Sequence, residues 1–136
     1  MQTPVEATKP VSAVTLQVLK TLQATAGNEE QARLALEHLI KHPQATYSMT
    51  VRGESMREAG IFDGDVLLVD RAIKPSHGQI VVAVVDGDFT CKQLWQRGGR
   101  LKLKAANPTF ADIVPTEGQT VEVWGVVIAA IKQFKR

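Results

Sequence analysis

Acyl transfer is the chemistry that residue types and their surroundings suggest for this sequence, and Ser55 is the candidate nucleophile. It lies in "VRGESMREAGIFDGDVLLVD" (51–70), just before a run of aliphatic residues. The stretch Glu54–Ala59 predicts one helical turn closed by Gly60. The backbone N–H groups of Ser55 and Met56 could then hold an oxyanion. The alternative is an ordinary turn serine, because a hydroxyl needs a base to become nucleophilic.

Two residues are candidates for that base. His77 lies in "KPSHGQ", a turn in which histidine is commonly just solvated. Lys92 lies in "FTCKQLW", on the same strand face as Thr90 and Leu94, where a solvated lysine is the ordinary interpretation. A free lysine has a pKa of about 10.4, so less than about one part in a thousand is neutral near pH 7. Lowering that pKa by about three units requires desolvation worth about 4 kcal/mol, so a catalytic Lys92 must be enclosed by apolar side chains.

The elements that would position these residues are mostly strands. Alternation or apolar runs predict strands in "YSMTVR", "DVLLVD", "QIVVAVV", "FTCKQLW", "RLKLKA" and "TVEVWGVVIAAI". Asp86-Gly87 and Gly98-Gly99 predict two tight hairpins. Strand follows strand without intervening helices, which favours a mainly β, compact, rolled or barrel-like antiparallel sheet over βαβ units.

The N-terminal part has a different character. Residues 1–27 are mixed and interrupted by prolines, which predicts a flexible arm. From Asn28, a capping residue and an apolar stripe predict one helix that ends at Pro43. The stripe comprises Ala32, Ala35, Leu36, Leu39 and Ile40.

Composition excludes several classes of protein. The 136 residues, 44% hydrophobic and 22% charged, are typical of one soluble globular domain with an arm. The net charge of +2 does not by itself indicate nucleic-acid binding. The lone Cys91 excludes an internal disulfide and fits the reducing cytoplasm. Metal-ligand spacings, cofactor motifs and apolar runs long enough to span a membrane are all absent from the sequence.

Several motifs in order resemble the self-cleaving serine peptidases of the LexA/UmuD family. They are "GESM" (53–56), "DGD" (63–65), "VLLVDRAIKPSHGQIVVAVVDGDFTCKQL" (66–94) and "VWGVVIAAIK" (123–132). The upstream "LIKHPQATYSMTVRGESM" also resembles the entry into the catalytic sheet of the UmuD branch, to which the sequence is most similar. The resemblance runs from about Leu36 to Lys132. It implies a LexA/signal-peptidase-like catalytic domain that dimerises.

The resemblance also implies roles for individual residues. The family's nucleophile and general base match Ser55 and Lys92, and His77 matches a turn position without a catalytic role. The family cuts its own chain at a small-residue–Gly bond upstream of the serine, and Ala26-Gly27 is the Ala-Gly bond in that region. Cleavage there would remove the arm, residues 1–27, from the catalytic and dimerisation domain, residues 28–136. By resemblance, RecA on single-stranded DNA would stimulate the cut. The shortened homodimer would then join a UmuC-like subunit as an error-prone translesion polymerase of the SOS response.

One departure bears on that cut. The stretch from Gly27 to Ser55 is several residues shorter than in UmuD relatives. Eight residues of strand before Ser55 span about 26 Å. The preceding helix, which runs in the opposite direction, spans about 20 Å over thirteen residues. The bond therefore reaches Ser55 only if the helix frays or the loop bends, or a partner's arm fills the site instead. Cleavage within one chain and between chains are both left open.

Three other functions are alternatives to this one. A LexA-type repressor needs a DNA-binding module, for which the 27 residues before the helix leave no room. A non-cleaving polymerase accessory of the same fold would retain Ser55 and Lys92, but the two residues would be catalytically inactive. In "KQLWQRGGRLKLK", basic residues around Trp95 could track phosphates, although such alternation is also typical of the solvated face of a sheet. The sequence therefore predicts direct nucleic-acid binding that is weak at most.

Overall fold

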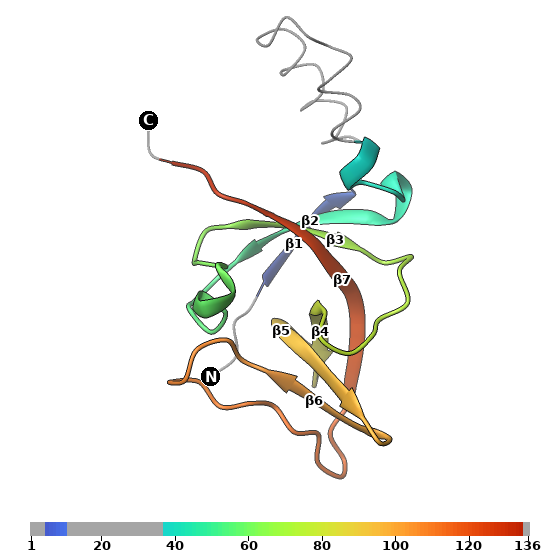
Figure 1. Cartoon of the computed structure of the whole chain (residues 1–136), viewed down its shortest axis with the longest axis vertical. Coiled ribbons are helices and arrows are strands. Elements are labelled where there is room, and N and C mark those ends of the chain that lie inside the picture. Colours follow the sequence, from blue (N-terminus) through green and yellow to red (C-terminus); the bar gives the residue numbers. More distant parts are fainter. Residues whose placement is uncertain (1–4, 11–36, 135–136) are drawn as a thin grey trace, which may run out of the picture.

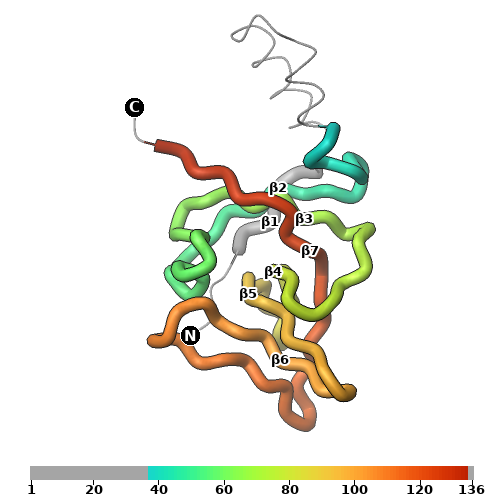
Figure 2. Tube along the Cα trace, viewed as in Figure 1, coloured from blue at the N-terminus to red at the C-terminus, as the bar shows by residue number. Residues whose placement is uncertain are grey.

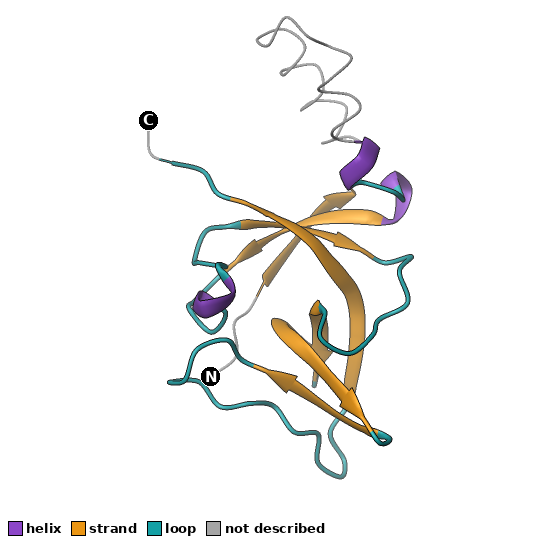
Figure 3. Cartoon of the chain, viewed as in Figure 1, coloured by secondary structure: helices purple, strands orange, loops and turns teal. Residues whose placement is uncertain are grey.

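The fold is one rolled antiparallel sheet, seen in a computed structural model that describes residues 5–10 and 37–134 (Figures 1 and 3). Seven strands of the described residues form the sheet, in the order β1-β2-β3-β7-β4-β5-β6. The strands are β1 (Val5–Pro10), β2 (Thr46–Val51), β3 (Val66–Asp70), β4 (Ile80–Val85), β5 (Asp88–Arg97), β6 (Arg100–Lys104) and β7 (Val121–Ile131). Two 3-10 helices, η1 (Pro43–Ala45) and η2 (Arg57–Ala59), connect them. The predicted mainly β, antiparallel fold is confirmed.

Strand β7 joins the two halves of the sheet. It pairs with β3 toward its C-terminal end and with β4 toward its N-terminal end, and each pairing contains a register shift. Extra residues of this kind bend a strand and increase its twist, which agrees with the curved course of β7 (Figure 2). At Gly125 of β7, a Cβ atom would lie 2.7 Å from Cγ1 of Val69 on β3. A glycine is therefore needed where the two strands approach closely.

The apolar faces of the rolled sheet enclose two core clusters. The first draws on the β2, β3, β4 and β5 strands and on the connection after β2, with Trp124 of β7 packed against it. Its buried members are Met49, Val51, Met56, Ile61, Leu67, Val69, Val82 and Cys91. The second lies among β4, β5, β6 and β7, and its buried members are Val81, Ala83, Val85, Leu94, Leu103 and Val126. Strand β5 contributes to both clusters, so a side chain near its middle is removed from water on either face.

Both predicted hairpins are present. Val85 pairs with Asp88 across the two-residue loop Asp86-Gly87, whose φ angles are 48° and 88°. Two positive φ angles in succession characterise the turn that matches the twist of the flanking strands. The Gly98-Gly99 loop between β5 and β6 has the same character, with φ angles of 58° and 75°. These two loops set the register of β4, β5 and β6.

The N-terminal region is described only in part. Strand β1 pairs with the edge of β2, with Val5 opposite Val51. This strand lies within residues 1–27, which were predicted to form the arm. Its pairing supplies partners for backbone groups at the edge of β2. Of the predicted helix, residues 37–39 are helical, and Ile40 packs against Leu68. Leu39 of the predicted stripe is exposed, and residues 28–36 lie outside the described part of the chain. None of the helices in the described residues is long and apolar enough to cross a membrane.

Candidate active site

Ser55 lies in a loop that is tied back to the end of strand β2. Gly53 has a φ of 95°, a conformation that favours glycine, and its N–H donates to Oδ1 of Asp63 at 2.7 Å. The Gly64 N–H donates to the carbonyl of Val51, the last residue of β2, at 2.9 Å. The loop between Val51 and Gly64 is therefore closed by a hydrogen bond at the end of β2, which holds Ser55 next to the sheet.

Directly after Ser55 the chain makes the predicted helical turn. It is the 3-10 helix η2, and it ends at Gly60, which has a φ of 80° and donates its N–H to the Arg57 carbonyl at 3.0 Å. Met56 and Ile61, on either side of this turn, are both buried in the first core cluster. The turn is thus anchored by apolar side chains at both ends, which limits the movement of Ser55.

The segment after β6 holds the same loop from another side. The Ala106 N–H donates to the Ser55 carbonyl at 2.8 Å, and the Ala106 carbonyl accepts the Glu58 N–H at 2.7 Å. The Asn107 side-chain amide donates to the Glu54 carbonyl at 2.9 Å. Three hydrogen bonds from residues some fifty positions away in the sequence therefore fix the backbone on both sides of the Ser55 side chain.

Lys92 lies in the middle of β5, and its side chain is completely buried. It pairs across the sheet with Val81 of β4, and Thr90 and Leu94 occupy the same face of β5. All three neighbours are buried as well. The apolar enclosure that a catalytic lysine would require is therefore present around Lys92.

The structure brings the Lys92 amine and the Ser55 hydroxyl together. Nζ of Lys92 lies 3.0 Å from Oγ of Ser55, 2.8 Å from Oγ1 of Thr90 and 3.2 Å from the Cys91 carbonyl oxygen. All three distances are within hydrogen-bonding range, and all three partners are uncharged. Among the described residues, no carboxylate forms a salt bridge with Lys92.

Burial has a direct consequence for the charge on this amine. Loss of solvent lowers the pKa of Lys92 to about 8, with a smaller opposing effect from Cys91. Burial also raises the pKa of the Cys91 thiol to about 12, so this neighbour is an uncharged thiol at neutral pH. At pH 7 about one Lys92 amine in ten is then neutral, against roughly one in 3000 at a lysine pKa of 10.5. A neutral amine at 3.0 Å from a hydroxyl can accept its proton.

The other predicted site residues are placed differently. Nδ1 of His77 accepts the Gln96 N–H at 3.0 Å, and its ring meets Trp95 edge to face. Gln96 is four residues beyond Lys92 along β5, a separation of about 13 Å. His77, bonded to Gln96, is therefore too far from Ser55 to act as its base and instead holds its own turn against β5. The predicted cleavage residues Ala26 and Gly27 lie outside the described residues.

Two residues without a predicted role, Thr90 and Lys132, complete the site. Thr90 was noted only as a neighbour on the face of Lys92, and its hydroxyl is the shortest contact of the amine. Lys132, just after β7, contacts the Asp65 carboxylate, and its amine lies 4.2 Å from the centre of the Phe62 ring. It ties the C-terminal end of β7 to the loop that carries Ser55. Strand alternation could have identified Thr90, whereas no local signal points to Lys132.

The chain is similar in sequence to several known proteins. Residues 13–128 match the family described as Peptidase S24-like. Protein MucA of Salmonella typhimurium is 43% identical over 102 residues, which cover 74% of this chain and 69% of that protein. Protein SamA of the same species is 36% identical over 134 residues, covering 98% of this chain and 92% of the relative. The LexA repressor of Azoarcus is 39% identical over 108 residues, which span about half of its length (54%) and 79% of this chain.

Proposed function

The chain belongs to the Peptidase S24-like family, as a UmuD-like member of the LexA/UmuD group, and we propose that it cleaves itself with Ser55 and Lys92. The observation that carries this proposal is the 3.0 Å separation of Nζ and Oγ at a fully buried amine whose pKa lies near 8. Membership of a serine peptidase family supplies the reaction type, peptide-bond hydrolysis through an acyl-enzyme.

The first step uses the neutral form of Lys92. Its two N–H bonds donate to Thr90 Oγ1 and the Cys91 carbonyl, and its lone pair accepts the proton of the Ser55 hydroxyl. Oγ then attacks the Ala26 carbonyl carbon, and the negative charge that develops on the carbonyl oxygen is held by the backbone N–H groups of Ser55 and Met56.

The remaining steps return the site to its starting state. The Lys92 ammonium gives its proton to the Gly27 nitrogen as the C–N bond breaks, which leaves Ala26 as an ester on Ser55. Lys92, neutral again, removes a proton from a water molecule that attacks the ester, and the ammonium then returns that proton to Oγ. The products are a carboxylate at Ala26 and an amine at Gly27.

The cut requires the segment that contains Ala26-Gly27 to occupy the site. A RecA filament on single-stranded DNA would favour cleavage by stabilising that arrangement, which shifts a population and adds no chemistry. The segment can come from the same chain or from a partner. Small residues at the bond suit an enclosed site beside a buried lysine.

The product of cleavage is the proposed working form. The shortened chain would act as a homodimer in the cytoplasm, bound to a UmuC-like subunit of an error-prone translesion polymerase in the SOS response. This part of the proposal is supported by the resemblance to the UmuD branch and by the similarity to MucA and SamA over most of the chain.

The test is autolysis of the purified chain, followed by mass spectrometry between pH 7 and 10.5, with and without RecA and single-stranded DNA. We expect a fragment beginning at Gly27, formed at a rate that rises about tenfold per pH unit below pH 8 and levels off above it. Ser55→Ala and Lys92→Ala should abolish it, while Lys74→Ala, at an exposed lysine, should not. An intact mass under every condition would indicate instead a non-cleaving accessory of the same fold.

A further inference from the structure

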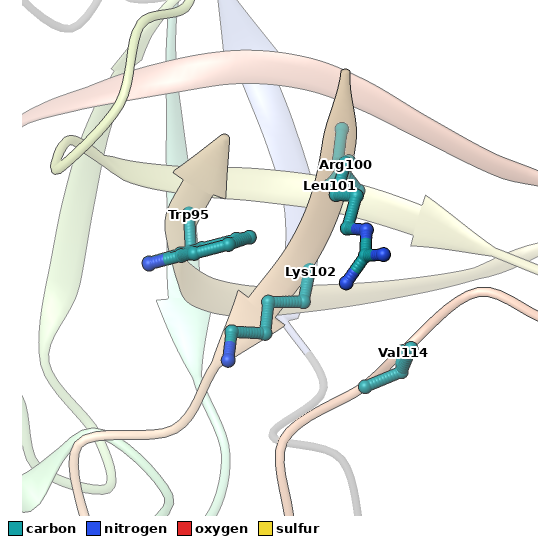
Figure 4. Close-up of a pocket in the computed structure, with 5 residues that line it drawn as sticks. All are labelled: Trp95, Arg100, Leu101, Lys102 and Val114. Atoms are coloured by element: carbon teal, nitrogen blue, oxygen red, sulfur yellow. The ribbon is translucent and has the colours of Figure 1, made fainter. Parts of the chain in front are cut away.

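A cavity of about 210 Å³ lies beside the β5–β6 hairpin, away from the contacts of Ser55 and Lys92. Its lining residues are Trp95, Arg100, Leu101, Lys102 and Val114. Figure 4 shows the Arg100 side chain reaching into the space between β6 and the segment that carries Val114. That segment is held alongside β6 by paired backbone hydrogen bonds between Leu103 and Ile113, of 2.9 and 2.8 Å.

One face of this hairpin concentrates positive charge. The cross-strand pairs Arg97–Arg100, Trp95–Lys102 and Gln93–Lys104 alternate with the pairs Leu94–Leu103 and Gln96–Leu101, so the six side chains of the first three pairs share one face of the hairpin. Leu94 and Leu103, on the other face, are buried. Four of the six are cationic: Arg97, Arg100, Lys102 and Lys104. Among the described residues, no salt bridge involves any of the four. The face therefore carries four basic groups that form no ion pair with a carboxylate of the described residues.

An aromatic ring lies within the basic face. The Lys102 amine is 4.5 Å from the centre of the Trp95 ring, which borders the cavity together with Arg100. Val114, on the opposite wall, is 59% exposed although it is apolar. A flat aromatic surface, two cations and an apolar wall thus meet in one concave site.

We propose that this face of the hairpin binds single-stranded nucleic acid, with a base against Trp95 and the adjoining phosphates on Arg100 and Lys102. Single-strand binding surfaces combine a basic track for the backbone with aromatic side chains for the bases. Along β6, Arg100, Lys102 and Lys104 recur every second residue, about 6.8 Å apart, and so form a linear series of cations. The inference does not depend on self-cleavage by Ser55.

An acidic peptide is the other polyanion that such a face could attract. Carboxylates would satisfy the cations but would leave the indole and Val114 with nothing flat or apolar to contact. A nucleotide supplies both kinds of group, a π-surface and an anion, at one site. The observations therefore favour nucleic acid over an acidic protein surface.

The binding experiment uses the full-length Ser55→Ala chain, so that cleavage cannot interfere. Fluorescence anisotropy of a labelled oligo(dT), measured from 20 to 200 mM salt, gives the affinity and its salt dependence. Trp95→Ala should weaken binding five- to a hundredfold. Arg100→Gln with Lys102→Gln should reduce the slope of log K against log salt by about 1.4, since about 0.7 is lost for each phosphate contact on a single strand.

The matched control replaces two exposed lysines elsewhere, Lys41→Gln with Lys74→Gln, which changes the net charge equally. This control should leave both the affinity and the slope unchanged. The proposal is overturned if the control and the Arg100/Lys102 variant behave alike, or if Trp95→Ala binds as the parent does. It is also overturned if poly-glutamate competes as well as oligo(dT), which would indicate an acidic protein partner. Cleavage is measured separately, so failure here leaves the role of Ser55 and Lys92 untouched.

Discussion

Replacing the buried lysine should change how stability depends on pH. The comparison is Ser55→Ala against Ser55→Ala with Lys92→Met, because neither chain can cleave itself. The pKa of Lys92 is about 8 in the folded protein and close to 10.5 when the chain is unfolded. Below pH 8 both states bind the proton, and the folded state carries a buried charge that costs about 3 kcal/mol, at 1.36 kcal/mol per pKa unit.

The sign follows from proton binding. Between pH 8 and 10.5 the unfolded chain holds a proton on Lys92 that the folded chain has released, so the free energy of unfolding rises with pH. Methionine cannot titrate and lacks this rise. The single variant should therefore gain about 3 kcal/mol relative to the double variant between pH 7 and pH 10.5. The hydrogen bonds that methionine cannot make to Thr90 and Cys91 lower the stability of the double variant by a similar amount at every pH, and do not affect this gain.

The assay is urea unfolding at several pH values, followed by circular dichroism. Cys91 acts in the opposite direction, because its raised pKa, about 12, makes the folded state less stable as the unfolded thiol ionises above pH 9. This contribution is present in both chains and cancels in the difference. Lys74→Met serves as the control, since an exposed amine keeps its water on folding. If the difference in unfolding free energy between the single and the double variant stayed constant from pH 7 to 10.5, the claim that burial lowers the pKa of Lys92 would be refuted.

Three further substitutions test other parts of the structure. Thr90→Val removes a hydrogen-bond acceptor that stabilises the Lys92 ammonium. The midpoint of the pH–cleavage profile should therefore move below 8, and the plateau rate should fall about tenfold. An unchanged profile would mean that Thr90 does not position the amine. Gly125→Ala should destabilise the fold by about 1–3 kcal/mol in urea unfolding, because the new Cβ would meet Val69 at 2.7 Å. Gly87→Ala should cost about 1 kcal/mol in the same assay from backbone strain alone, since its φ is 88° and nothing lies within 4 Å of the new Cβ; equal stability with the parent would contradict the assigned turn.

Strand positions and turns could be predicted because their signals are local. The Asp86-Gly87 and Gly98-Gly99 loops need positive φ angles that few residue pairs accept, and both form tight hairpins. The aliphatic run 66–69 has apolar side chains on both faces, as a strand with neighbours on each side requires, and β3 does lie between β2 and β7. The turn after Ser55, closed by Gly60, followed from the same kind of local signal.

The strand β1 could not be predicted in this way. Val5–Pro10 is short and contains Pro10, and its partner is the edge of β2, some forty residues later in the chain. Local propensity carries no information about an edge that exists only after the sheet has formed. The same holds for Lys132 and Asp65, whose contact depends on where β7 ends relative to the Ser55 loop.

The sequence by itself determined which residue types were available for chemistry: a serine after a glycine turn, a lysine inside a strand, and the alternation that makes the fold a sheet. It also defined the condition for a catalytic Lys92: because a free lysine is charged at neutral pH, this amine must be enclosed by apolar side chains. Only the tertiary structure decided that the condition is met. Desolvation depends on the side chains that surround an amine, and those around Lys92 come from β4, β5 and the loop after β2, which are brought together only when the sheet rolls up.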